Sequence, residues 1–402
     1  MVEFNPLAPE FKANPYPFYD ALREATSLFY WEGRNIWFAT DYETCVSLLK
    51  NSNLGHELQR VVPGEETGRE DSSRRHSPLV AMRSRWMLLR DPPAHTRLRG
   101  LVQEAFAPRM IDQLRSRIQT ATDQLITAAE RKGEMDVVED LAAPLPVMVI
   151  ADMIGVPESD RHVLRRWSRD LVDTLELTES QEVFDRGAAA TADFSAYLRE
   201  LAQLRRRQPR QDLMSALVHA EDQGDALTEE ELISTCILLL VAGHETSTNF
   251  IGNGVLALLR NPDQLGALKA HPELGRSAIE ELLRYDSPVQ TTFRTVLHPM
   301  EFNDRRLEQG ASVAFMLGAA NHDPAIFVDP HALDITRDPN PHLSFSYGIH
   351  YCLGAPLARL EGQIAIQTLL RRAPNIRLLD ENPRFRNTWA ARGLESLPVR
   401  LA

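Results

Sequence analysis

The sequence contains little cysteine, and its cysteines do not suggest disulfide bonds. The 402 residues include three cysteines, Cys45, Cys236 and Cys352, which lie far apart in the chain. An odd number of scattered cysteines is typical of proteins in a reducing compartment and argues against a disulfide framework. We therefore expect a cytoplasmic protein.

Long hydrophobic runs and an excess of basic residues are also missing. The longest apolar run, CILLLVAG at 236–243, is far shorter than the ~20 residues that a membrane helix needs. The acidic, proline-containing start of the chain does not resemble a signal peptide. A formal net charge of −12 argues against the basic footprint of a nucleic-acid-binding protein. We expect a soluble monomer with neither a nucleic-acid nor a membrane partner.

No internal repeat or low-complexity linker divides the chain, and its hydrophobic periodicity is mostly helical. Aromatic and β-branched runs at 27–31 and 36–40 predict an early hairpin, and the segments TTFRTV and ASVAFML predict strands between 288 and 341. The polar stretch 64–77 predicts a long solvated loop. Helices are expected around 96–131, 158–176, 181–205, 212–222, 229–260, 263–270, 275–285 and 355–372. The expected fold is mainly α with small β-sheets.

The helix expected at 229–260 is the longest, and its centre is unusual. Thr228 and Glu231 form a capping box at its start, and Asn261-Pro262 should end it. About thirty residues at 1.5 Å each span roughly 45 Å, enough to cross a domain. The centre is apolar nearly all round, yet it contains the polar segment AGHETST at 242–248. Polar groups inside a buried helix are costly, so we expect these residues to have a function, except His244, which should pack against a neighbouring helix.

Cys352 lies between Gly348 and Gly354, just ahead of the last helix, which has Pro356 in its first turn. Free amides and the positive end of the helix dipole would stabilise a thiolate at this position. The residues alone leave several roles open for this cysteine. It could be a buried core residue like Cys45 and Cys236, a zinc ligand together with His342 and His350, a nucleophile, or a ligand of haem iron.

Several motifs in the same order along the chain carry a family resemblance. FSYGIHYCLGAPLAR at 345–359 resembles the cysteine-ligand loop of the cytochrome P-450 family, F-x-x-G-x-H/R-x-C-x-G. AGHET at 242–246 is similar to the A-G-x-D/E-T motif of that family's central helix, and DPPAHTRLR at 91–99 resembles an H-x-x-x-R segment of bacterial members. Glu281 and Arg284 match the E-x-x-R motif. One departure is Ser346, where many members have glycine.

The resemblance implies roles for individual residues. Cys352 would be the axial thiolate of haem b, with Phe345 shielding the sulfur and the amides around Gly354 donating hydrogen bonds to it. Glu281, Arg284 and Arg337 would form a structural network. The resemblance places the haem propionates against His95, Arg99, Arg294 and His350. The central helix would contribute a dioxygen groove and a proton relay through Ala242, Gly243, Glu245 and Thr246.

The function implied is that of an iron-containing oxidoreductase, a monooxygenase of the soluble bacterial kind. It would insert one oxygen atom of O2 into an apolar substrate such as a secondary metabolite, terpenoid or fatty acid. Electrons would come from NAD(P)H through a separate ferredoxin- or flavodoxin-type partner, because 402 residues accommodate a single haem domain, 1–402, without a fused reductase. Two alternatives are a peroxide-driven hydroxylase and a haem-binding sensor or carrier without turnover. The Glu245–Thr246 pair disfavours both.

Overall fold

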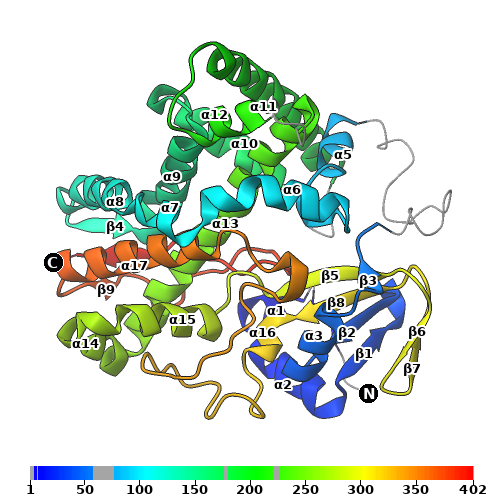
Figure 1. The fold of residues 1–402 in the computed structure, drawn as a ribbon. Coiled ribbons are helices and arrows are strands. Elements are labelled where there is room, and N and C mark those ends of the chain that lie inside the picture. The colour runs from blue at the N-terminus through cyan, green and yellow to red at the C-terminus, as the bar shows by residue number, and fades with distance from the viewer. Residues whose placement is uncertain (1–3, 7, 58–76, 176–179, 221–226, 402) are drawn as a thin grey trace. The chain divides into compact units, whose positions relative to one another are not determined.

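The computed structural model describes residues 4–6, 8–57, 77–175, 180–220 and 227–401 (Figure 1). The loop expected at 64–77 therefore falls almost entirely outside the described residues. Contacts between residues divide the chain into two units. One contains Met1–Gly55, Ile118–Ala143 and Thr246–Ala402, and the other contains His56–Arg117 and Pro144–Glu245.

The first unit is built on a five-stranded sheet in the order β1-β2-β8-β5-β3. The expected hairpin forms its edge, with Leu28 opposite Ala39 and Trp31 opposite Ile36. The central strand β8 is buried along its whole length. Because side chains alternate across a strand, Val313 and Phe315 enter one apolar cluster and Ala314 and Met316 another. The strands are β1 Leu28–Trp31, β2 Ile36–Ala39, β3 Leu54–Gly55, β5 Thr291–Val296 and β8 Ser312–Met316.

Two smaller sheets, together with helices from the N-terminal, middle and C-terminal segments of the chain, complete this unit. The three-stranded sheet has the order β4-β10-β9, and β6 pairs with β7. These strands are β4 Glu134–Asp136, β6 Met300–Phe302, β7 Arg305–Leu307, β9 Arg377–Leu378 and β10 Pro398–Arg400. The helices are α1 Pro9–Ala13, α2 Tyr16–Ala25, α3 Tyr42–Leu49, α8 Arg115–Glu130, α14 Pro262–Ala270, α15 Gly275–Tyr285, α16 Leu317–Ala320 and α17 Ala355–Arg372.

The second unit is helical, and α10 and α11 pack side by side within it. Trp167 of α10 stacks on Phe194 of α11 at 5.2 Å between ring centroids. A buried ion pair between Arg205 and Asp212 joins the end of α11 to the start of α12, with Arg205 Nε 2.5 Å from the carboxylate. The helices are α5 Pro78–Arg83, α6 Ala94–Gln103, α7 Pro108–Asp112, α9 Pro144–Ile154, α10 Arg161–Asp173, α11 Gln181–Arg207 and α12 Leu213–Ala220.

The long helix α13 (Glu229–Arg260) forms where the sequence predicts it. The capping box is confirmed, because Thr228 N–H donates to Glu231 Oε2 at 3.0 Å and Glu231 N–H donates to Thr228 Oγ1 at 3.2 Å. The helix contributes residues up to Glu245 to the second unit and residues from Thr246 onward to the first. It is unbroken through the polar segment AGHETST at its centre.

Two differences from the predicted elements have clear causes. The segment 96–131 is not one helical stretch but three helices, α6, α7 and α8, because Pro108 starts a new helix. The sequence pattern also does not predict α2 and α9. For α9 the cause is that it begins PLPV and is apolar on nearly every side, which hides its period. Within the described part of the chain, no helix is long and apolar enough to cross a bilayer.

Candidate functional site

The loop before α17 is folded so that Cys352 ends a tight, hydrogen-bonded turn. Cys352 N–H donates to the carbonyl oxygen of Phe345 at 3.0 Å, which closes the loop. Two residues inside this loop, Ser346 and Gly348, have positive φ values of 61° and 76°. A side chain at Gly348 would place its Cβ 2.8 Å from the carbonyl oxygen of Leu49. Glycine at 348 is thus required both for backbone angle and for space.

Cys352 differs from the other two cysteines in its exposure. Cys45 and Cys236 are completely buried, whereas Cys352 is exposed. Burial raises the pKa of the Cys236 thiol to about 12, and burial likewise raises that of Cys45. These two are core thiols, as expected. Cys352 precedes the first turn of α17, with Gly354 as N-cap and Pro356 in the first turn, so it is the one cysteine placed to act as a thiolate ligand.

The structure provides no support for a zinc site. Among the described residues, no group of three or more histidine, cysteine, aspartate or glutamate side chains could hold a metal ion. His342 is instead bound to Glu280, with Nε2 3.1 Å from Oε2. An exposed thiol can instead serve as the protein's ligand to a porphyrin iron, because the macrocycle supplies the four ring nitrogens.

The E-x-x-R network holds the segment that leads to the cysteine loop. Arg284 Nε and Nη2 each donate to Glu281 at 2.8 Å, and Arg337 Nε donates to the same carboxylate at 3.1 and 3.2 Å. Arg284 Nη1 also donates to the carbonyl oxygens of Asn321 and Pro330. Neither Glu281 nor Arg284 is exposed. The expected structural role of Glu281, Arg284 and Arg337 is confirmed.

Four residues at the centre of α13 form the accessible part of an otherwise buried stretch. Ala242 is exposed, and Gly243, Glu245 and Thr246 are partly exposed, whereas residues 232–238 and 247–258 are buried. These four residues are the ones expected to contact dioxygen or carry protons. The lack of a Cβ at Gly243 also serves packing, because a Cβ would lie 2.4 Å from Ile150 Cδ1 on α9.

His244 packs as the sequence suggests. It is buried, and its Nδ1 is 3.0 Å from Ser168 Oγ on α10. The ring therefore belongs to the contact between α13 and α10 within the second unit. This separates His244 from its accessible neighbours Glu245 and Thr246.

The four residues expected to bind propionates lie on three elements. His95, which is buried, and Arg99 are one turn apart on α6, which is the spacing of side chains on one helix face. Arg294 is buried on β5, where it is paired with Val313 of β8. His350 ends the short 3-10 helix η9 (Gly348–His350), two residues before Cys352.

Glu361, an acid buried in α17, is not among the residues that the sequence motifs indicate. Glu361 is 1% exposed, and burial raises its pKa to about 8 although Ser247 donates a hydrogen bond to it. The available signal was helical spacing, because Glu361 lies four residues after Leu357 and three before Ile364, on the apolar face of the helix. An acid on that face predicts either a partner or a raised pKa.

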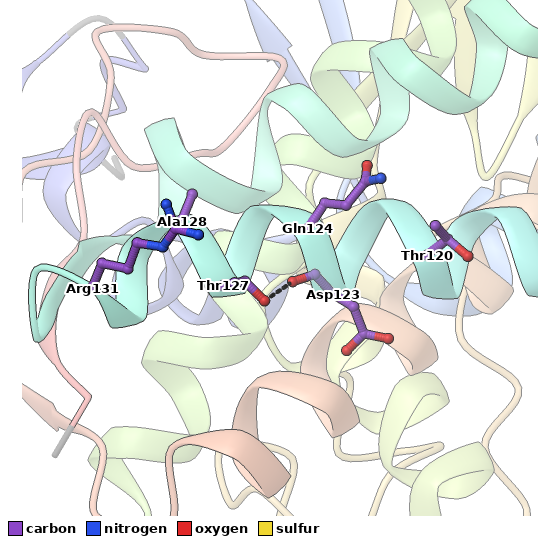
Figure 2. Close-up of a pocket in the computed structure, with 6 residues that line it drawn as sticks. All are labelled: Thr120, Asp123, Gln124, Thr127, Ala128 and Arg131. Atoms are coloured by element: carbon purple, nitrogen blue, oxygen red, sulfur yellow. Dashed lines mark hydrogen bonds between the residues drawn. The ribbon is translucent and has the colours of Figure 1, made fainter.

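A surface hollow on α8 does not belong to this site. Figure 2 shows its residues along one face of that single helix, where Thr127 Oγ1 donates to the carbonyl oxygen of Asp123 at 2.7 Å. Asp123 also pairs with Arg372 at 3.2 Å. None of the expected site residues lines the hollow, which is formed by Thr120, Asp123, Gln124, Thr127, Ala128 and Arg131.

Known proteins resemble this chain over nearly its whole length. A family model described as cytochrome P-450 matches residues 64–373. A biotin biosynthesis cytochrome P-450 of Bacillus subtilis is 42% identical over 97% of both chains. The polyketide biosynthesis cytochrome P-450 PksS of the same organism is 38% identical over 99% of this chain and 98% of that one.

A solved structure gives the same result in three dimensions. A cytochrome P-450 in complex with acyl carrier protein ligated to hexadec-9Z-enoic acid superposes with a TM-score of 0.90 at 42% identity, covering 97% of this chain and 99% of that one. The mainly α fold with small sheets is thereby confirmed as the fold of this family. The chain belongs to the cytochrome P-450 family, whose members bind haem b, and it is an oxygen-incorporating oxidoreductase like the relatives that are named monooxygenases.

Proposed function

We propose that this chain is a haem-thiolate monooxygenase in which Cys352 would hold the haem iron through its thiolate and Thr246 and Glu245 would deliver protons. The observation that carries the proposal is the exposed Cys352 at the end of a loop closed by its N–H bond to Phe345. When bound, haem b supplies the activation of O2 and the transfer of one oxygen atom.

The chain's own residues fit this cofactor. The exposed thiol offers one ligand, and the chain beside it is not crowded, because a Cβ at position 354 would meet Sγ at 3.9 Å, an ordinary van der Waals contact. Phe345 would shield the sulfur from water. The basic side chains that would neutralise the two buried propionates are His95, Arg99, Arg294 and His350.

Thr246 and Glu245 are adjacent and accessible in the middle of α13. A hydroxyl and a carboxyl at this position can pass protons between solvent and the oxygen-binding region. Ala242 and Gly243 would leave space for dioxygen. The accessible acid–alcohol pair favours oxygen-dependent turnover with a ferredoxin- or flavodoxin-type donor over the peroxide-driven hydroxylase and the non-catalytic sensor or carrier.

The ligand assignment is tested by spectroscopy of the purified holoprotein. With Cys352 as ligand, the reduced carbonyl complex has the red-shifted Soret band of thiolate ligation. Replacing Cys352 with Ser should remove that band, whereas Cys236→Ser, at a buried cysteine, should keep it. An ordinary haem-protein Soret band in the unaltered protein would refute the proposal.

For the substrate, we propose a long acyl or polyketide chain, free or tethered to a carrier protein. The support comes from the relatives, whose names refer to biotin and polyketide biosynthesis, and from the solved structure with a carrier-bound hexadecenoyl chain. The test is a spectral titration that follows the spin-state change as water leaves the iron. Free hexadecenoic acid, the same chain on acyl carrier protein and a terpenoid of similar size are the three arms. A response to the terpenoid alone would contradict the proposal.

A further inference from the structure

We propose that Arg359 is a positioning residue for the cysteine loop, holding the ring of Phe345 and, through Phe345, the backbone of Cys352. The proposal rests on the proposed function, because its consequence is measured at the thiolate ligand. Arg359 lies on α17, seven residues after the cysteine.

Arg359 is fixed by a two-point contact with Glu280 of α15. Arg359 Nε is 2.6 Å from Oε1 and Nη2 is 2.8 Å from Oε2, the parallel geometry that gives arginine–carboxylate pairs their directionality. Burial opposes ionisation of Glu280, but the hydrogen bonds from His342 and Arg359 lower its pKa to about 2. Glu280 therefore stays ionised, and the guanidinium stays in one orientation.

His342 completes the cluster from the other side of Glu280. The N–H of Ser344 donates to His342 Nδ1 at 3.3 Å, and His342 Nε2 lies 3.1 Å from Glu280 Oε2. Both partners of Glu280 thus converge on one carboxylate. Because that carboxylate balances the charge of Arg359, the effect of the arginine on the loop is mainly geometric.

The held guanidinium lies over the ring of Phe345. Arg359 Cζ is 4.5 Å from the ring centroid, within the range of a cation–π contact. Nη1 of the same guanidinium is 3.3 Å from Tyr351 Oη, and the rings of Phe345 and Tyr351 are 6.2 Å apart. Arg359 therefore contacts side chains at both ends of the turn that closes on Cys352.

The link from Phe345 to Cys352 is the 3.0 Å hydrogen bond between the Phe345 carbonyl oxygen and the Cys352 N–H. If Arg359 no longer holds the Phe345 ring, Phe345 can move, and its carbonyl oxygen, the acceptor for the Cys352 N–H, moves with it. Movement of the ring also lets water approach the Cys352 sulfur and donate hydrogen bonds to it. Additional donors stabilise the thiolate charge and raise the reduction potential of a thiolate-bound iron. Arg359 thus tunes the ligand without touching it.

The test compares midpoint potentials of holoprotein variants, together with the position of the ferrous carbonyl band. Arg359→Lys keeps the positive charge but loses the planar guanidinium that binds Glu280 at two points and stacks on the ring of Phe345. We expect it to raise the potential in the same direction as Arg359→Ala. The expected size is a three- to tenfold change in the one-electron equilibrium constant, tenfold being about 59 mV.

Arg372→Ala is the matched control. Arg372 is on the same helix and, like Arg359, is held by acid side chains, here Glu130 and Asp123, but it has no described contact with the cysteine loop. Its replacement should leave the potential unchanged. A second variant, Glu280→Gln, removes the anchor of Arg359 and should shift the potential in the same direction as Arg359→Lys.

Three outcomes overturn the inference. Arg359→Lys could match the unaltered protein while Arg359→Ala shifts, which would make the charge the cause. Both Arg359 variants could have the same midpoint potential as the control Arg372→Ala. The shift of Arg359→Ala could also persist unchanged in a Phe345→Leu background, whereas action through the ring predicts that it disappears there. An unaltered protein without the thiolate carbonyl band overturns the proposed function as well, so the two failures are distinguishable.

Discussion

The carboxylate of Glu281 accepts two hydrogen bonds of 2.8 Å from the guanidinium of Arg284, and neither side chain is exposed. Removing one partner of a buried ion pair costs about 3–5 kcal/mol, because the remaining charge is left without compensation. We expect Glu281→Gln to lose stability on this scale, measured by urea unfolding. Asp112→Asn is the control, because Asp112 and Arg115 have the same spacing on an exposed surface and their pair should be worth under about 1 kcal/mol. Equal losses in both variants would refute the buried role.

The raised pKa of Glu361 predicts a pH dependence of stability. Burial raises the pKa to about 8 from the ordinary value of 4.5. Between these two values the folded state holds a proton that the unfolded state has released, so the free energy of unfolding falls as pH rises. The contribution is complete below about pH 4.5 and lost above about pH 8.

Glu361→Gln keeps the size of the side chain but cannot ionise. The slope of unfolding free energy against pH between about 5 and 8 should be shallower in this variant, and near pH 8 the variant should be more stable than the unaltered protein by a few kcal/mol at most. Urea unfolding at several pH values checks this. An unchanged slope would show that Glu361 is ionised in the folded state.

The positive φ of 61° at Ser346 predicts a stabilising substitution. Non-glycine residues pay roughly 1–2 kcal/mol in this region, and the Ser346 hydroxyl is buried with no hydrogen-bond partner among the described residues. Ser346→Gly should stabilise the fold by about 0.5–1 kcal/mol. This net gain is smaller than the relieved strain, because the greater conformational entropy of glycine also stabilises the unfolded chain. Thermal unfolding measures this, with Ser346→Ala separating loss of the hydroxyl from relief of the backbone.

The opposite change at Gly348 should destabilise the loop. Its φ is 76°, and a Cβ would lie 2.8 Å from the carbonyl oxygen of Leu49. We expect Gly348→Ala to cost about 2 kcal/mol or more, from backbone strain and the contact together. The measurement is again thermal unfolding, and a cost below about 0.5 kcal/mol would show that the loop rearranges easily.

Thr246→Ala should uncouple electron consumption from product formation. Losing the hydroxyl removes a proton donor, so more hydrogen peroxide is released per NAD(P)H consumed. The control is Thr248→Ala on the same helix, whose hydroxyl is buried and donates to the carbonyl oxygen of Ala142 at 3.2 Å. That variant should lose stability but keep its coupling. If the two variants release equal peroxide, Thr246 has no part in the relay.

The sequence by itself determined the elements whose signals are local. The capping box at Thr228, the end of α13 before Pro262, the hairpin at 28–39 and the C-terminal helix all follow from caps, prolines and side-chain periodicity, and the structure confirms them. The family also followed from sequence, because its motifs are short, ordered and chemically specific.

Only the tertiary structure decided which polar groups are buried and what they contact. Helical spacing places Glu361 on the apolar face of α17, but it does not reveal the contact of Glu361 with Ser247 of α13. The partners of the buried Arg205, which are Asp212 and the carbonyl oxygen of Gly155, likewise come from other segments. The same holds for Arg359, whose orientation depends on Glu280 in α15, 79 residues earlier in the chain. Local patterns encode backbone conformation, whereas burial and pairing depend on contacts between distant segments, which a single sequence does not display.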